Sequence, residues 1–298
     1  MMKKARALFL ILLLGILLQP PHALADEKQL LIGLIPEMNI FKQKQRFVPL
    51  GEYLSKKTGI QVRFTVLSRY GNILESFQKE KLDAAFFGSF TGAVAIHKLG
   101  VVPLARPVNL DNSSTYQGYI FVRKDSGIID AAGLRGKTFA FVEKATTAGY
   151  IFPLAYLRDH GISAPDGYFR SFYFAGSHDA AIDAVLRKKA DAGAAKNTIY
   201  DMMIANNPSF EKDLRIIARS PAVPSNGLCV RKDLDDVLKR KLREALLAMH
   251  ADPEGKKVLS QFSALKFTET TEKDYEPVHL LAKKAGIDLI KYSGGINE

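Results

Sequence analysis

The sequence has very little cysteine and none of the residue spacings that are typical of hydrolases or metal centres. Cys229 is the only cysteine among the 298 residues, so an internal disulfide is excluded. It stands in the apolar run 227–230, which predicts a small buried side chain. Neither an HExxH pair of histidines nor a GxSxG nucleophile turn is present. These absences argue against a hydrolase, and they predict a protein that is not an enzyme and that needs no cofactor and no metal.

The excess of positive charge is spread along the chain. The formal net charge is +11, but lysines and arginines alternate with acidic residues. No basic stretch interleaved with aromatic residues is found, so nucleic acid is not an expected partner. A generally basic surface favours anionic ligands or anionic surfaces, and it explains most of the charge.

A long apolar run occurs only near the N-terminus. Three basic residues precede the apolar run 7–18, and the small-x-small pattern Ala23-Leu24-Ala25 follows it. The run is too short to span a membrane comfortably. We therefore predict that residues 1–25 form a signal peptide, cleaved after Ala25, and that the mature protein is soluble and periplasmic. Removing this segment lowers the formal charge from +11 to +8, because three basic residues and no acidic residue leave with it.

Strands and helices alternate along the mature chain. Short runs rich in β-branched and aromatic residues are each followed by a polar turn and then by apolar residues at helical spacing. Such alternation is typical of α/β proteins with parallel sheets. The predicted strands cover residues 30–35, 61–67, 83–87, 137–142, 169–174 and 191–195.

The order of strands, turns and helices recurs in a second part of the chain, which predicts two lobes. Segments Tyr119–Asp125 and Leu228–Asp233 resemble each other, and both are interpreted as strands that cross between the lobes. The predicted fold is a two-lobed α/β clamshell, in which each lobe is a mostly parallel sheet flanked by helices and the two crossover strands form the hinge. The predicted lobes are residues 26–122 plus 226–298, and residues 123–225.

Polar turns follow the predicted strands. In open α/β sheets, ligands bind beyond the carboxyl ends of the strands, where helices begin. These turns are rich in hydroxyl, amide and tyrosine side chains and poor in paired carboxylates. Facing each other across two lobes, they predict a cleft that closes around a small anion. The turns are 36–39, 68–70, 89–91, 146–147, 177–178 and 197–198.

The segment around two threonines shows this pattern most clearly. A predicted strand, 138–142, runs into a polar loop, and a helix with Gly161 at its C-terminal cap starts at Ala148. Free N–H groups and the positive end of the helix dipole make such a start an anion site. Thr146 and Thr147 would add two uncharged donors. The alternative that one of them is only an N-cap stays open.

Taken together, these segments resemble the periplasmic substrate-binding proteins of phosphonate, phosphite and phosphate ABC transporters. The resemblance covers essentially the whole mature chain and depends on the order and spacing of several segments. It implies a type II periplasmic-binding-protein fold and capture of a small phosphorus oxyanion for an ABC transporter permease, with a monomer expected. The segments are Ile32–Glu37, Ser68–Tyr70, Phe86–Phe90, Val142–Tyr150, Gly176–Ala181 and Ala190–Ala194.

The resemblance also assigns roles to individual positions. Thr146-Thr147-Ala148-Gly149 matches a hydroxyl-rich turn that grips phosphoryl oxygens, with one hydroxyl fewer here. Tyr70 matches a tyrosine that closes over the anion. A second tyrosine of the family is replaced by Gly92, which should leave that side of the pocket smaller or more open. Lys196 stands where members often carry an acidic or neutral residue, and it should favour extra negative charge on the ligand over an aminoalkyl group.

The remaining candidates have ordinary alternatives. His178 matches a polar turn that helps to define the ligand, or it only caps a helix. Ser89 and Thr91 either bind the ligand or cap a helix. Tyr116 lines the cleft or packs in the hinge. The full set of predicted ligand-binding residues is Tyr70, Ser89, Thr91, Tyr116, Thr146, Thr147, His178 and Lys196.

One other function uses the same clamshell. A periplasmic sensing protein would present the bound oxyanion to a membrane sensor kinase instead of a permease, and the sequence does not separate the two.

Overall fold

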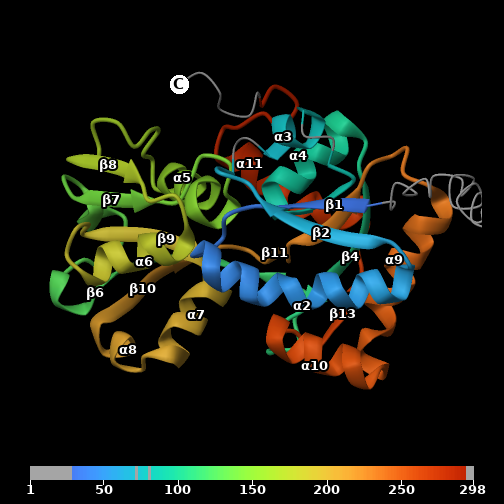
Figure 1. The fold of residues 1–298 in the computed structure, drawn as a ribbon. Coiled ribbons are helices and arrows are strands. Elements are labelled where there is room, and N and C mark those ends of the chain that lie inside the picture. Colours follow the sequence, from blue (N-terminus) through green and yellow to red (C-terminus); the bar gives the residue numbers. More distant parts are fainter. Residues whose placement is uncertain (1–28, 71–72, 80–81, 293–298) are drawn as a thin grey trace, which may run out of the picture.

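The computed structural model describes residues 29–70, 73–79 and 82–292, which form two lobes lying side by side (Figure 1). The signal peptide predicted for residues 1–25 lies outside these residues. Within the described ranges, no helix is both long and apolar enough to cross a membrane. We call the six-stranded sheet with the helices packed on it the first lobe, and the five-stranded sheet with its helices the second lobe.

The first lobe is built on a sheet with strand order β13-β4-β12-β3-β1-β2. The central strands are buried apolar runs, as is expected for a sheet covered by helices on both faces. β1 pairs in parallel with β2 and β3, whereas β12 runs antiparallel to both of its neighbours. The strands are β1 (Gln29–Leu34), β2 (Gln61–Val66), β3 (Ala84–Phe87), β4 (Val102–Val108), β12 (Gly227–Val230) and β13 (Lys266–Glu269).

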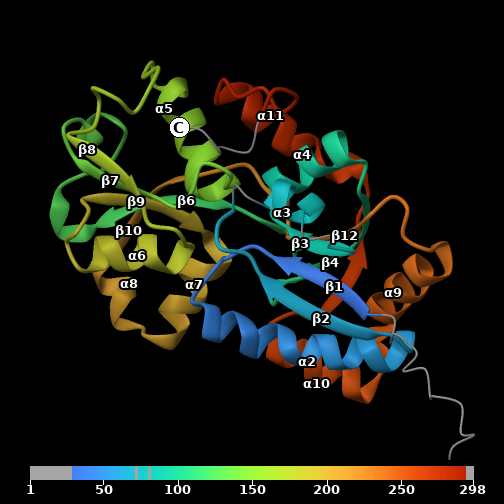
Figure 2. The same ribbon diagram turned by 45° about the horizontal axis from the view of Figure 1, so that its top comes forward.

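Helices cover both faces of this sheet (Figures 1 and 2). One face carries α2 (Ile40–Thr58), α9 (Asp236–Ala248) and α10 (Pro253–Phe262), whose apolar side chains form one cluster with the strands. The other face carries α3 (Ile73–Lys79) and α4 (Ser89–Leu99). α2 ends at Gly59, whose left-handed φ of 74° is a conformation that glycine adopts without strain.

The second lobe has strand order β10-β6-β9-β7-β8. β7 pairs in parallel with β8 and β9, whereas β6 runs antiparallel to both of its neighbours. The strands are β6 (Gly118–Arg123), β7 (Thr138–Phe141), β8 (Ser171–Phe174), β9 (Ala192–Lys196) and β10 (Leu214–Arg219). The helices are α5 (Phe152–Asp159), α6 (His178–Leu186), α7 (Asn197–Asn206) and α8 (Ser209–Asp213).

Two short strands, β5 (Thr115–Tyr116) and β11 (Val223–Pro224), pair with each other where the chain passes between the lobes. β6 and β12 follow them directly along the chain. Both sheets are therefore mixed, because β6 and β12 enter by a short connection and not through the helical crossover that a parallel neighbour requires. The predicted parallel pairing holds for β2-β1-β3 and β8-β7-β9.

The lobe boundaries predicted from the sequence stay a prediction, and strand pairing bears on one of them. Residues 118–122 were assigned to the first lobe. β6 pairs with β9 and β10, which places these residues in the second sheet.

The C-terminal helix α11 (Glu276–Lys284) packs against both lobes. Its buried side chains Val278 and Leu281 belong to one apolar cluster that also contains side chains of α4 and α5. Lys284 forms an ion pair with Asp159 of α5 at 3.2 Å. Short 3-10 turns cover Lys124–Ser126, Ala132–Leu134, Met249–Ala251 and Glu272–Tyr275.

One glycine position tests how tightly the end of β7 is packed. A Cβ added to Gly149 would lie 2.4 Å from the Cβ of Val142, so Gly149→Ala should force the backbone apart. We expect a loss of about 1–3 kcal/mol in the free energy of unfolding, measured by urea titration. Gly133→Ala is the control, because its added Cβ would approach nothing closer than 3.3 Å. Equal stability of the two variants would contradict this packing.

Candidate ligand-binding site

A small cavity lies where the carboxyl ends of the strands of both lobes meet. Its volume, counted as space for the centre of a water molecule, is about 10 Å³, which is enough for about one water. All the predicted ligand-binding residues except Thr91 line it, although their role in binding stays a prediction. The cavity is lined by Ile35, Glu37, Tyr70, Gly88, Ser89, Phe90, Tyr116, Ala145, Thr146, Thr147, His178, Lys196 and Asn226.

A chain of hydroxyl groups joins the two lobes across this cavity. The Ser89 hydroxyl lies 2.6 Å from that of Tyr116 and 2.7 Å from that of Thr147. The backbone N–H of Phe90, in the first turn of α4, donates to Thr147 Oγ1 at 3.0 Å. The start of α4 thus faces the start of the helix in the other lobe, and both present N–H groups toward the same space.

Thr91 does not belong to the cavity. Its hydroxyl donates to the Gly88 carbonyl one turn earlier, at 3.1 Å. Its inclusion among the ligand-binding residues is not supported by this placement, because the side chain is used within the first turn of its own helix. Thr91 does not cap the helix either, because Gly88 holds the N-cap position and no side chain makes a capping hydrogen bond there, whereas Ser89 lines the cavity.

The two threonines differ in their contacts. Thr147 begins a π-helical turn, Thr147–Ile151, that leads into α5. Thr146 holds the N-cap position, but its side chain makes no capping hydrogen bond and donates instead to the Glu143 carbonyl at 2.5 Å. The alternative that one threonine only caps the helix is therefore wrong for this side chain.

Tyr70 is the most unusual polar residue of the site. Its side chain is 2% exposed, and its hydroxyl has no hydrogen-bond partner among the described residues. Burial, with the Glu37 carboxylate nearby, holds the pKa of Tyr70 well above its ordinary value. The phenol therefore keeps its proton and is available as a donor. A buried hydroxyl without a partner costs stability, which suggests that it serves a ligand.

His178 is a buried, neutral imidazole. It is the first residue of α6, and the Lys196 backbone N–H donates to its Nδ1 at 3.2 Å. Burial lowers the pKa of His178 to about 4, so the ring is neutral at pH 7. Because Nδ1 accepts, the hydrogen-bond network assigns the ring proton to Nε2, which makes Nε2 a donor. Its ring lies edge-on to that of Tyr70, with centroids 6.0 Å apart.

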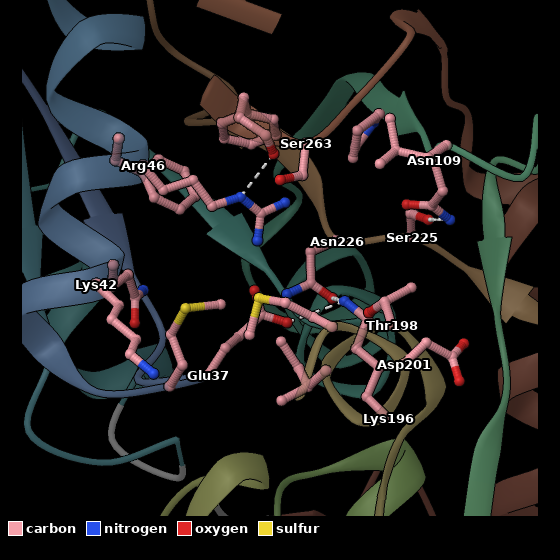
Figure 3. A pocket seen from close by; sticks show the side chains of 18 of the residues that line it. Glu37, Lys42, Arg46, Asn109, Lys196, Thr198, Asp201, Ser225, Asn226 and Ser263 are labelled. Atoms are coloured by element: carbon pink, nitrogen blue, oxygen red, sulfur yellow. Dashed lines mark hydrogen bonds and ion pairs between the residues drawn. The ribbon is translucent and has the colours of Figure 1, made fainter. Parts of the chain in front are cut away.

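A buried ion pair, Glu37–Lys196, forms one wall of the cavity. Figure 3 shows this pair from the side of a neighbouring, larger pocket. Lys196 Nζ lies 2.9 Å from Glu37 Oε1 and donates to Asn226 Oδ1 at 3.2 Å. It also lies 4.5 Å from the centre of the Tyr116 ring. Glu37 and Lys196 are only 5% and 7% exposed. Glu37 comes from the turn after β1 and Lys196 from the end of β9, so the pair joins the two lobes.

The two partners respond differently to burial. For Glu37, burial alone would raise the pKa, but Lys196 and Arg46 outweigh it and leave the pKa below its ordinary value. For Lys196, burial lowers the pKa against the pull of Glu37. The pair has no net charge. Sequence reasoning missed Glu37 as the partner of Lys196, and the expected preference for extra negative charge on the ligand stays a prediction. The one available signal was an acidic residue in the turn after the first strand.

Gly92, which was expected to leave its side of the pocket smaller or more open, does not reach the cavity. It is not a lining residue, and an added Cβ would lie 2.7 Å from Tyr275 Cε1. The fully buried ring of Tyr275, which comes from far along the chain, fills this space. The space beside Gly92, where other family members carry a tyrosine, is thus filled by the Tyr275 ring.

The cavity therefore presents donors without net charge. Hydroxyl groups, the His178 imidazole and helix-start N–H groups surround it, while the one charged pair cancels itself. Within residues 29–70, 73–79 and 82–292, no group of histidine, cysteine, aspartate and glutamate side chains is placed to hold a metal ion. Such an arrangement suits an oxyanion that accepts several hydrogen bonds.

Solved structures of other proteins share this fold. A binding protein component of an ABC phosphonate transporter from Pseudomonas aeruginosa superposes with a TM-score of 0.81 at 24% identity, covering 88% of this chain and 87% of the other. PhnD1 from Prochlorococcus marinus, solved in complex with methylphosphonate, gives 0.78 at 22% identity, covering 88% and 99%. The chain therefore has the fold of the type II periplasmic binding proteins.

Sequence comparison then identifies the family. The family model described as "ABC transporter, phosphonate, periplasmic substrate-binding protein" matches residues 32–275, so the chain belongs to this family. It is 28% identical over 290 residues to the "Phosphonates-binding periplasmic protein" of Escherichia coli, covering 96% of this chain and 85% of the relative. Membership makes it a periplasmic binding protein and not an enzyme, as the sequence predicted.

A second relative is similar over most of its length. The chain is 23% identical over 269 residues to the "Probable ABC transporter phosphite binding protein PhnD1" of P. marinus, covering 87% of this chain and 91% of the relative.

The ion pair can be tested by a double-mutant cycle. Glu37→Gln or Lys196→Met alone leaves one buried charge without its partner, so each should lower the free energy of unfolding by roughly 3–5 kcal/mol. The double variant should lose much less than the sum of the two, because no charge is left buried. Urea unfolding at pH 7 measures all four proteins. Additive losses would show that the two charges do not depend on each other.

The buried imidazole predicts a dependence of stability on pH. The folded-state pKa of His178 is about 4, below its ordinary value near 6.5, so the unfolded chain binds a proton that the folded chain does not. The free energy of unfolding therefore does not depend on this group above pH 6.5. It falls as the pH drops from 6.5 toward 4, and the loss reaches about 3 kcal/mol.

Urea titrations between pH 7.5 and 4.5 should therefore show a smaller acid loss for His178→Asn, whose side-chain oxygen can still accept from the Lys196 N–H. Parallel stability curves for wild type and variant would contradict the assignment of a neutral buried imidazole.

Proposed function

We propose that the small cavity binds the phosphoryl group of a phosphonate, phosphite or phosphate anion, and that the protein delivers this ligand to an ABC transporter permease. The single observation that carries the proposal is the buried Tyr70 hydroxyl. It lines the cavity and lacks any protein partner among the described residues, so it is a donor kept for a ligand acceptor.

The binding mechanism is capture by uncharged donors. Ser89, Tyr116 and Thr147 bond to one another in the closed arrangement. When an anion enters between the lobes, these hydroxyls turn to its oxygens, together with Tyr70 and Nε2 of His178. Hydrogen bonds to a charged acceptor contribute roughly 1.5–3 kcal/mol each. A few of them support micromolar or tighter binding after the cost of ordering and closure.

Entry of the ligand requires the lobes to separate. The cavity of about 10 Å³ is far smaller than a tetrahedral oxyanion, and hydrogen bonds cross between the lobes around it. The Asn39 N–H donates to Asp179 Oδ2 at 3.1 Å, and the His178 N–H donates to the Glu37 carbonyl at 3.2 Å. Both residues that donate begin or cap a helix, so closure joins helix starts of the two lobes. We propose rotation about β5 and β11 as the hinge motion.

The wider setting belongs to the same proposal. Residues 1–25 would direct export and be removed after Ala25, and the mature protein would act as a monomer without nucleic acid. The relatives support a phosphorus ligand, since one is named for phosphonates and another for phosphite.

Tyr70→Phe gives the sharpest test of the proposal. It removes one hydroxyl from the cavity and keeps the ring contact with His178. We expect affinity for the preferred anion to fall by about tenfold or more, since one charged hydrogen bond is lost. Stability without ligand should stay equal or rise, because a buried hydroxyl without a partner is removed. Calorimetric titration with phosphate, phosphite, methylphosphonate and sulfate measures the first quantity, and thermal unfolding measures the second.

The matched control is Thr91→Val, which removes a hydroxyl outside the cavity and should leave affinity unchanged. Protein that has been unfolded and refolded to strip bound ligand should be used. Failure of every phosphorus anion to bind would overturn the proposed function. Unchanged affinity in Tyr70→Phe would remove this hydroxyl from the site.

A further inference from the structure

A second and much larger pocket lies on the other side of the Glu37–Lys196 pair. Its volume is about 770 Å³, which is within the range of pockets that hold small organic molecules. It shares four lining residues with the small cavity, so a single layer of side chains separates the two spaces. The shared residues are Ile35, Glu37, Lys196 and Asn226.

The pocket lies between helix starts of the two lobes. Figure 3 shows Lys42 and Arg46 on α2 along one side, with Thr198 and Asp201 of α7 across from them. Asn226 and Lys196 lie between these walls, at the boundary with the small cavity. A ligand held in the small cavity could therefore reach this pocket only past the ion pair.

Arg46 is a cation held in place inside this pocket. Its Nε donates to the Phe262 carbonyl at 2.9 Å, and its guanidinium carbon lies 4.3 Å from the centre of the Phe262 ring. Its two terminal nitrogens make no hydrogen bond or ion pair with any described residue. A stacked guanidinium with these nitrogens available is preorganised to bind a carboxylate or phosphoryl group through two hydrogen bonds.

The other charged groups of the pocket do not neutralise this guanidinium directly. Lys196 already balances Glu37. Asp111 and Asp201 line the pocket, but both are exposed, so water and salt screen them. Lys42 is a second, exposed cation on the same helix. Burial lowers the pKa of Arg46, partly offset by the Glu37 carboxylate, and a ligand anion beside it would offset this further.

Gln43 adds an acceptor one turn before Arg46. Its Nε2 donates to the Ile35 carbonyl at 2.6 Å, which fixes the amide, while its buried Oε1 has no partner among the described residues. The residue is 2% exposed. An unpartnered buried acceptor in the lining of a pocket is satisfied by a donor on the occupant, such as a hydroxyl group.

We propose that this pocket is a second subsite, which takes the organic substituent of a phosphonate or phosphate ester and binds a second anionic group at its far end through Arg46. The inference rests on the proposed function, since the phosphoryl group occupies the small cavity. The substituent passes the boundary between the two spaces, which Ile35, Glu37, Lys196 and Asn226 form, and the ion pair stays intact beside it. An aminoalkyl substituent, which has a cation at its end, is disfavoured beside Arg46.

The test compares ligands of equal length. Phosphonoacetate, 3-phosphonopropionate and 4-phosphonobutyrate carry a terminal carboxylate, and ethyl-, propyl- and butylphosphonate are their uncharged counterparts. Calorimetric titration of the refolded mature protein should show that at least one carboxylate binds tenfold or more tightly than its counterpart. Aminoethylphosphonate should bind more weakly than propylphosphonate.

The variant Arg46→Gln should abolish this carboxylate-to-alkyl ratio. Lys44→Gln on the same helix is the control, because Lys44 is exposed and lines neither space, and it should keep the ratio. Thermal unfolding shows that each variant is folded.

Three results would overturn the inference. Equal affinity within every pair would reject the second subsite while the proposed function stands. A ratio that survives Arg46→Gln would reject Arg46 as its cause. No binding of any phosphorus ligand would overturn both proposals together.

Discussion

The closed arrangement of the two lobes depends on one buried ion pair, Glu37–Lys196. Each partner comes from a different lobe, and both are almost fully removed from water. In surroundings of low dielectric constant, either charge without the other would cost several kcal/mol, so the two lobes must present them together. The proposed hinge motion would separate the pair and hydrate both charges. Closure of the two lobes and formation of the ion pair therefore depend on each other. Asn226, beside the hinge, accepts a hydrogen bond from Lys196 and so belongs to the same group.

Around this pair, the site is built from donors that carry no charge. The Ser89, Tyr116 and Thr147 hydroxyls satisfy one another, and Tyr70 alone has no protein partner. If these hydroxyls exchanged their mutual hydrogen bonds for bonds to a neutral ligand, little binding free energy would be gained. Bonds to a charged acceptor are stronger, so an anionic ligand gains more. Selectivity for an oxyanion thus arises from the acceptor and not from an opposing protein charge. Burial keeps the pKa of His178 at about 4 and raises the pKa of Tyr70 and Tyr116, so at neutral pH the imidazole is neutral and both tyrosines keep their protons.

The ion pair also separates the small cavity from the large pocket. It stands between a space that fits a phosphoryl group only after opening and a space large enough for an organic substituent. Arg46 belongs to the larger space and is fixed by Phe262, far along the chain. Nothing in the sequence near residue 46 distinguishes this arginine from the lysines around it on α2. Only the packing of α10 against α2 separates a stacked guanidinium from an exposed one.

Much of the fold and of the small cavity could be predicted from the sequence, for a physical reason. Parallel strands end at one edge of a sheet, so polar turns that follow successive strands must come together there. This logic predicted Tyr70, Ser89, Thr147 and His178 around one cavity. It failed for Thr91, whose hydroxyl is used within its own helix, because spacing alone does not show which way a side chain turns.

The sequence by itself therefore determined the class of fold, the alternation of strands and helices, and the edge of the sheets where the site would form. These follow from local periodicity and from turn residues, which act over a few positions of the chain. The tertiary structure alone decided which charges meet, which space Tyr275 fills beside Gly92, and which strands enter antiparallel. Those features depend on contacts between residues 70 or more positions apart in the chain, so no local sequence pattern predicts them.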